Sequence, residues 1–268
     1  MVRGLVAHDR SLAGSLNGSV AVTVRLIRPP VAGPAHPVEG YLPGVCFSPQ
    51  ADLVGGVVLA AIGIDAVRHV DRRAGHLALA ALPLLLAAHQ LDETLVWLGL
   101  QGHVPAAVGQ VATWVYLLFA FVVLPVYVPA TVRGLEPPGW RRTLMGGFTA
   151  AGVAVAAVLL VAMLAGPVTA ALGDHHLRYG TGLHTGFLIV VAYVAVTCGS
   201  LLFSSYGPLA LFGVVNLLAV TVLAHAEIDG FASLWCGWAA LTSAAIALSL
   251  RFGGVPLAPG RRPSPGSA

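Results

Sequence analysis

Residues 77–100 read LALAALPLLLAAHQLDETLVWLGL, and this stretch determines the class of fold. A helix that crosses the hydrocarbon of a membrane needs about 20 predominantly apolar residues. Leucine and alanine make up most of this stretch, so it meets that requirement. Its second half nevertheless contains one histidine and two adjacent acids, His89, Asp92 and Glu93. The stretch therefore predicts a membrane-spanning helix that carries a polar site.

The composition of the whole chain supports a membrane protein. Charged residues make up 9% of the chain, apolar types make up 57%, and the mean hydropathy is +0.85. Soluble domains carry about 25% charged residues. All 14 basic residues are arginine, which together with the abundant alanine, glycine and valine suggests a bacterial genome rich in G and C. No phosphate loop, dinucleotide fingerprint or nucleophile elbow is present, so neither a soluble nucleotide enzyme nor a nucleic-acid binder is favoured.

The apolar stretches predict an all-α integral membrane bundle of about seven transmembrane helices. Helices are expected because only they satisfy their own backbone in lipid with segments of this length. The expected spans are residues 51–67, 77–100, 104–128, 144–165, 186–203, 209–225 and 231–250.

The arginines predict how the bundle is oriented in the cell inner (plasma) membrane. Loops 68–76 and 129–143 and the tail after Leu250 each carry three arginines, and a seven-span topology places all three on one side. The positive-inside rule makes that side cytoplasmic. Arg178, between spans four and five, is the one arginine of the opposite interhelical loops. The prediction is therefore an outer N-terminus and a cytoplasmic C-terminus.

Both ends of the chain differ from the apolar middle. Residues 1–44 are rich in glycine and proline and have no long apolar run, so they predict a disordered tail or an over-extended gene start. In the second case translation would begin at Val45. An N-terminal peptide of the mature protein that starts earlier would rule it out. The transmembrane domain is expected over residues 45–250, followed by a disordered cytoplasmic tail over residues 251–268.

The two acids of the second span are energetically costly in a membrane and need stabilising partners. His89, Glu93 and Trp97 follow one another at intervals of four and share one face of a helix, with Asp92 beside them. Each acid costs about 2.5 to 3.5 kcal/mol at the centre of a span, and each leucine returns about 0.3 to 0.6 kcal/mol. Two acids therefore cancel roughly what the ten leucines of the stretch contribute. We expect this face to lie inside the bundle, with polar partners or with its acids protonated.

The topology places several further polar residues in the same, outer half of the membrane. Ser48 and Asp52 begin the first span, His184 opens the fifth and His225 closes the sixth. The candidate site residues fall into two groups. Ser48, Asp52, His89, Asp92 and Glu93 are candidates for chemistry, and His89, Glu93, His184 and His225 are candidates for binding a metal.

Three interpretations of these groups stay open. The first is a divalent transition metal such as zinc, which imidazole and carboxylate would ligate and which could activate water for a reaction on a small molecule or lipid. No paired histidines or HExxH motif support it. The second is a proton relay in a membrane carrier. The third is a non-catalytic scaffold in which the polar groups only fix helix packing. Whether the protein is an enzyme is left open, and no nucleic-acid partner is expected.

Other residues are expected to have structural roles. Cys198 lies in an apolar span, and we expect it to be an unreactive residue of the packed interior. Cys46 and Cys236 share the outer half of the membrane and could form a disulfide or ligate a metal together. The histidines of the loop after the fourth span, His175 and His176, are expected to be ordinary loop residues. The aromatic residues expected to anchor span ends at the membrane interface are Trp114, Tyr116, Tyr127 and Trp140.

Three short motifs resemble those of a known family. Val45-Cys46-Phe47-Ser48 corresponds to an opening Met-Cys-Phe-Ser if the valine is read as an initiator. Gln90, Glu93 and Trp97 form a second-helix motif, and Ser233, Trp235 and Cys236 form a last-helix Ser-x-Trp-Cys. In these motifs the chain resembles an uncharacterised family of bacterial multi-pass membrane proteins, a domain-of-unknown-function group. The resemblance covers residues 45–250 and implies the membrane architecture without an activity.

Overall fold

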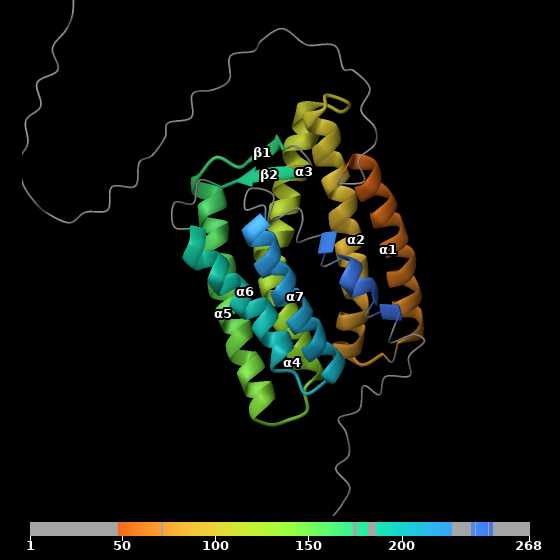
Figure 1. The fold of residues 1–268 in the computed structure, drawn as a ribbon, viewed down its shortest axis with the longest axis vertical. Helices are drawn as coiled ribbons and strands as arrows, with labels where there is room; N and C mark the ends of the chain where they lie inside the picture. The colour runs from red at the N-terminus through yellow and green to blue at the C-terminus, as the bar shows by residue number, and fades with distance from the viewer. Residues whose placement is uncertain are drawn as a thin grey trace, which may run out of the picture. The chain divides into compact units, whose positions relative to one another are not determined.

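The structure of the chain is a computed structural model, which describes residues 48–70, 72–173, 176–181, 186–226, 237–238, 240–245 and 247–248. These residues are mostly helical, as Figure 1 shows. The helices are α1 (Pro49–His69), α2 (Ala74–Leu100), α3 (Ala106–Leu118), the π-helical turn η1 (Phe119–Val123), α4 (Leu124–Leu135), α5 (Trp140–Ala165), α6 (Gly186–Leu202) and α7 (Gly207–Ala226). The described residues of 237–248 are helical as well.

Four helices are long and apolar enough to cross a membrane, namely α1, α2, the continuous run from α3 through η1 to α4 (Ala106–Leu135), and α5. Two shorter apolar helices, Leu188–Leu202 and Gly207–Val222, lie within the fifth and sixth predicted spans. The prediction of a bundle of apolar helices is thus confirmed for most of the described residues, although the fold is not entirely helical. The count of seven spans and their orientation in a membrane stay predictions.

The third span is longer than predicted. It was expected to end at residue 128, but the helix continues to Leu135 and has Arg133 in its last turn. The interruption lies earlier, at η1, where Leu124 donates its N–H to the carbonyl of Phe119, five residues back. Pro125 follows at once and has no N–H to donate, so the regular pattern of hydrogen bonds is broken there. The helix absorbs the break as a π-helical turn and continues.

A small two-stranded sheet lies between α5 and α6, where the sequence predicted only a loop. Strand β1 (Thr169–Leu172) pairs antiparallel with β2 (Leu177–Gly180), with Leu172 opposite Leu177 and Thr169 opposite Gly180. Gln110 of α3 donates to the carbonyl of Val168, which fixes the start of the hairpin to α3. The hairpin is thereby held over the adjacent ends of α2 and α3 (Figure 1).

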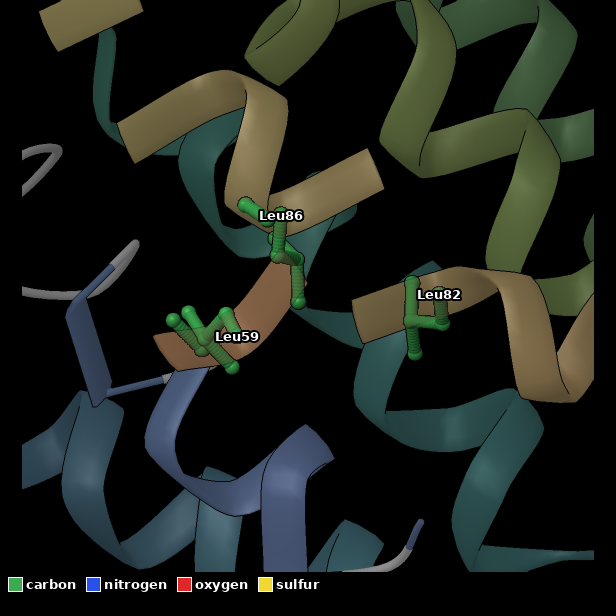
Figure 2. Packing of buried hydrophobic residues seen from close by; sticks show 5 residues of the cluster. Leu59, Leu82 and Leu86 are labelled. Atoms are coloured by element: carbon green, nitrogen blue, oxygen red, sulfur yellow. The ribbon is translucent and has the colours of Figure 1, made fainter. Parts of the chain in front are cut away.

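The bundle has two chemically different ends. We call the end with β1, β2 and the α2–α3 connection (residues 101–105) the hairpin end. The opposite end, with the α1–α2 connection (70–73), the α4–α5 connection (136–139) and the α6–α7 turn (203–206), is the arginine end. Between them α1 packs along α2, and Leu59 of α1 belongs to one buried cluster with Leu82 and Leu86 of α2 (Figure 2).

Small residues allow close helix packing at the positions that matter for the site. A Cβ on Gly99 of α2 would lie 2.5 Å from the Cα of Gly109 of α3, so these two backbones touch. A Cβ on Gly56 of α1 would lie 2.8 Å from the side chain of Leu91 on α2, so α1 also approaches α2 closely. The contacts at Gly99 and Gly56 hold α3 and α1 tightly against the half of α2 that carries the acids.

Candidate functional site

The polar face of α2 lies inside the bundle, as predicted. His89, Gln90, Glu93 and Trp97 are all buried, and Glu93 is 0% exposed. Asp92 is half-buried at the edge of this face. A helix in this position directs its polar face at other elements, because α1 and α3 pack against the same half of α2. The next residues to consider are therefore those which α1, α3 and the hairpin contribute.

Helix α1 contributes Asp52, which is 2% exposed and lies beside Trp97 of α2. The indole N–H of Trp97 is directed at this carboxyl group, although outside ordinary hydrogen-bond geometry. Ser48 has a different role. It precedes α1 and its hydroxyl accepts the N–H of Ala51 at 3.3 Å, so it is the N-cap of the helix. The structure thus brings Asp52 to the predicted site and assigns Ser48 to helix capping.

Helix α3 and η1 contribute aromatic rings that enclose His89. The imidazole of His89 stacks on Tyr116, with ring centroids 4.0 Å apart, and the ring of Phe119 lies 4.7 Å away. Tyr116 is 0% exposed, so the prediction that it anchors a span end at the membrane interface is wrong. The π-helical turn begins at Phe119, directly beside this histidine. Such turns are frequent at functional sites, because they change the direction of side chains within a helix.

The hairpin completes the site with Tyr179 of β2. Its ring stacks on Tyr116 with centroids 4.4 Å apart, and its hydroxyl lies 3.5 Å from Oε1 of Glu93, a long hydrogen-bond contact. Leu177 of the same strand is fully buried against Val96 and Trp97 of α2. Side chains alternate along a strand, so Arg178 lies on the other face and is exposed. The arginine of this end is therefore not the counter-ion of Glu93.

Several polar atoms of this region are buried. The carboxyl oxygen Oδ2 of Asp52, Oδ2 of Asp92 and the amide oxygen of Gln90 have no hydrogen-bond partner among the described residues. A buried polar atom without a partner costs about 1 to 3 kcal/mol. Such atoms are tolerated where function requires them or where water or another group supplies the missing bond. This concentration at the hairpin end distinguishes the site from an ordinary apolar core.

A metal centre among the described residues is not supported. No group of three or more histidine, cysteine, aspartate or glutamate side chains converges within the described part of the chain. The predicted ligands His89 and Glu93 are both in the site, whereas His184 and the side chain of His225 lie outside the described residues. Cys46 and Cys236 lie outside them too, and Cys198 is buried as predicted. The metal site and the cysteine pairing therefore stay predictions.

Of the two histidines in the loop after α5, only His176 lies among the described residues. His175 lies outside the described residues, and His176 is buried in the turn between the strands, where its carbonyl accepts the N–H of Gly173 at 2.8 Å. His176 is thus part of a tightly closed hairpin turn.

Sequence reasoning missed a further buried acid, Glu136, at the arginine end. It is 2% exposed, and its Oε1 accepts the hydroxyl of Ser204 at 2.8 Å and the N–H of Ser205 at 2.7 Å. Tyr206 donates to the carbonyl of Leu135 at 3.0 Å. Burial and the nearby carboxylate of Glu136 raise the pKa of Tyr206, and Arg73 acts in the opposite direction. Glu136 thus ties the end of α4 to the α6–α7 turn.

Comparison with known families identifies the family. Residues 45–257 match the model of a family of unknown function, DUF6629. The chain belongs to the DUF6629 family. This confirms the predicted membership of an uncharacterised family, and the match begins at Val45, where the resemblance in the sequence begins. No curated protein and no solved structure matches this DUF6629 chain.

The residues that sequence reasoning missed had weak signals. Tyr179 lies in the four-residue strand Leu177–Gly180, which is too short for an alternating pattern to be recognised. Tyr116 has the sequence environment of any interfacial aromatic residue, and only its neighbours in space show its role. Glu136 follows directly after an apolar helix, and this position could have marked it as a residue that interacts with a neighbouring turn.

Proposed function

We propose that this DUF6629 protein is a multi-pass membrane protein in which Glu93 takes up and releases a proton, as part of a proton-coupled carrier. The observation that carries the proposal is the complete burial of Glu93 at a helix face that also holds His89, with Tyr179 in contact and with Asp52 of α1 beside Trp97 of the same face. Intramembrane acids grouped with histidine are typical of proton relays in pumps and transporters.

The physical argument begins with the charge of Glu93. An ionised carboxylate in an apolar interior is costly unless a proton, a cation or hydrogen-bond donors compensate it. Within α2 the backbone N–H groups are occupied by the helix itself, so the compensation has to come from side chains of other elements or from a proton. Tyr179 supplies one hydroxyl at 3.5 Å. Binding of a proton would neutralise Glu93 and remove the cost of the buried charge, and loss of the proton would restore that cost.

The surrounding residues have distinct roles in this proposal. Asp52 and Asp92 are further carboxyl groups at the same end of the bundle, and Asp92 is half-buried and thus closest to solvent. Asp92 would receive protons from the surface, and Asp52 would accept them within the bundle. His89 is held in one ring orientation by its stack on Tyr116. An imidazole can accept a proton at one nitrogen and release one from the other, after which a turn of the ring or a tautomer exchange restores its starting state.

The same arrangement favours proton exchange over the metal-assisted reaction predicted from the sequence. A reactive metal site needs about three protein ligands in one place. His89 and Glu93 provide two candidates within the described residues, and further ligands would have to come from His184 or His225. Proton exchange requires only groups whose contacts the structure already contains, so it is the function that the geometry supports best.

The test measures protonation of Glu93 directly. We expect infrared difference spectra of the purified protein, recorded between acidic and alkaline pH, to contain a carboxylic acid C=O band that Glu93→Gln removes. Glutamine keeps the size of the side chain and cannot exchange a proton. Glu136→Gln is the matched control, because Glu136 is a buried acid at the opposite end. An identical band in wild type and Glu93→Gln would refute proton exchange at this residue.

A second measurement tests the carrier itself. In liposomes loaded with a pH-sensitive dye, the wild-type protein should transmit protons in response to an imposed pH gradient, and Glu93→Gln should abolish this flux. Glu136→Gln should retain it. A flux that persists unchanged in Glu93→Gln would show that protons do not pass through this site.

A further inference from the structure

The arginine end brings together two connections that are distant in the sequence. A Cβ on Gly75, at the start of α2, would lie 2.6 Å from the carbonyl oxygen of Gly134 near the end of α4. The backbones of the α1–α2 connection and of the end of α4 are therefore in direct contact. Arg73 lies two residues before Gly75, and Arg133 is adjacent to Gly134. The structure thus places arginines from both connections at one location.

The start of α5 adds an aromatic residue and two further arginines. Trp140 is 67% exposed, and the guanidinium of Arg141 lies 5.2 Å from the centre of its ring. Arg142 follows and is exposed. Arg133 belongs to α4, but its side chain lies beside the start of α5, since a Cβ on Gly146 of α5 would be 3.6 Å from its Nε. Arg133, Trp140, Arg141 and Arg142 form what we call the basic patch.

Among the described residues of this end, the two acids, Glu136 and Asp65, are engaged with other groups. Glu136 is buried, and its Oε1 is occupied by Ser204 and Ser205 of the α6–α7 turn. Asp65 lies 3.0 Å from the ring of His69, on the last turn of α1. The exposed charge of the patch is accordingly positive. This is more specific than a general excess of arginine, because the structure buries Glu136 and leaves Arg133 and Arg142 exposed.

We propose that the basic patch binds the headgroup of an acidic phospholipid. Guanidinium groups bind phosphate through paired, charge-assisted hydrogen bonds, and tryptophan favours the headgroup level of a membrane. Basic sites at the ends of membrane helices hold anionic headgroups for the same reason. From the patch, α5 continues with the exposed side chains of Ala150, Ala151 and Val153, which offer an apolar surface to the acyl chains. A soluble phosphate ion would use only the arginines, whereas a phospholipid uses both parts.

The test is a binding titration of the full chain in mild neutral detergent, followed by native mass spectrometry. The probes are short-chain phosphatidylglycerol and phosphatidylcholine with identical acyl chains. We expect wild type to bind phosphatidylglycerol more tightly, and each arginine near an anionic headgroup to contribute about fivefold. The double variant Arg133→Gln/Arg142→Gln should thus lose about 25-fold in affinity for phosphatidylglycerol. Arg178→Gln, which removes an exposed arginine at the hairpin end, is the matched control and should bind like wild type.

Three outcomes would overturn the proposal. Equal binding of both lipids by wild type would show that the headgroup charge is not recognised. An equal loss in Arg178→Gln would show that total charge matters rather than the patch. Displacement of phosphatidylglycerol by inorganic phosphate, at constant ionic strength, would identify a site for a soluble anion. All variants change exposed side chains, and unchanged thermal unfolding would confirm that they fold.

Discussion

Tyr116 is the residue on which the hairpin end depends most directly. Its ring stacks on His89 from α2 and on Tyr179 from β2, so it connects the polar face of the bundle with the hairpin. Replacement by leucine keeps an apolar side chain of moderate size in the core but removes both ring contacts. Replacement by phenylalanine keeps both rings stacked and removes only the hydroxyl. These two variants separate the stacking from every other property of the residue.

The expected effect follows from the number of stacks that each process breaks. An aromatic pair contributes about 0.5 to 1.5 kcal/mol beyond its buried area. Local opening of the hairpin breaks the stack of Tyr116 on Tyr179, whereas global unfolding breaks both stacks. Tyr116→Leu should therefore destabilise the docked hairpin by about 0.5 to 1.5 kcal/mol and the whole fold by about 1 to 3 kcal/mol. The first value corresponds to a population of open hairpin that is about 2- to 12-fold higher.

Limited proteolysis measures this population. Trypsin cleaves after Arg178, which lies in β2 and has to leave the strand before it fits a protease. When reclosing is faster than cleavage, the cleavage rate tracks the open population. We expect cleavage after Arg178 to be about 2- to 12-fold faster in Tyr116→Leu and unchanged in Tyr116→Phe. Equal rates in the two variants would refute the conclusion that stacking on Tyr116 holds the hairpin in place.

Three further predictions concern other parts of the molecule. Glu136→Ala leaves two donors of the α6–α7 turn without their acceptor and should lower the free energy of unfolding, measured in a thermal assay, by about 2 to 6 kcal/mol. Glu136→Gln keeps an accepting oxygen and should lower the free energy of unfolding far less. Gly99→Ala should cost about 1 to 3 kcal/mol, because the new methyl group would meet Gly109. Gly147→Ala has open space and should be neutral or stabilising in the same thermal assay. Treatment with a chelator should leave the Glu93 carboxyl band unchanged, whereas a band that appears or grows after chelation would favour the predicted metal site, because a metal-bound carboxylate carries no proton.

The helical architecture could be predicted from the sequence because it follows from composition and length. Apolar runs of about 20 residues have few stable alternatives to a helix, so all described helices, the π-helical turn included, overlap the expected apolar spans. The boundaries were less predictable. The predicted third span ends at residue 128, which places Pro129 and Arg133 in the loop that follows. The helix nevertheless includes both, because proline removes one hydrogen bond and the arginine lies in the last turn at the surface.

The site could be predicted only in part. Its α2 face was predictable, because one helix contains all its residues at regular spacing. Asp52 was predictable because α1 and α2 are adjacent and antiparallel. Tyr179 and Tyr116 were not, because their roles depend on a hairpin of two four-residue strands and on a stack between separate elements. Local sequence patterns contain no information about such a contact between distant segments.

The two buried glutamates, Glu93 and Glu136, differ in what surrounds their carboxyl groups. Glu136 lies just beyond a helix, where a backbone N–H and a serine hydroxyl of a neighbouring turn bind its oxygen at 2.7 and 2.8 Å. These donors are fixed by the fold. Glu93 lies within a helix whose own N–H groups are already bonded, so its partners are side chains of other elements.

One of those partners belongs to the hairpin, and this has a mechanical consequence. The hydroxyl of Tyr179 remains near Glu93 only while β2 is docked against Val96 and Trp97. Undocking would withdraw a hydrogen-bond donor from the carboxylate and admit water in its place. In the proposed function, the position of the hairpin therefore determines how strongly Glu93 holds its proton, and the protonation of Glu93 in turn biases the position of the hairpin.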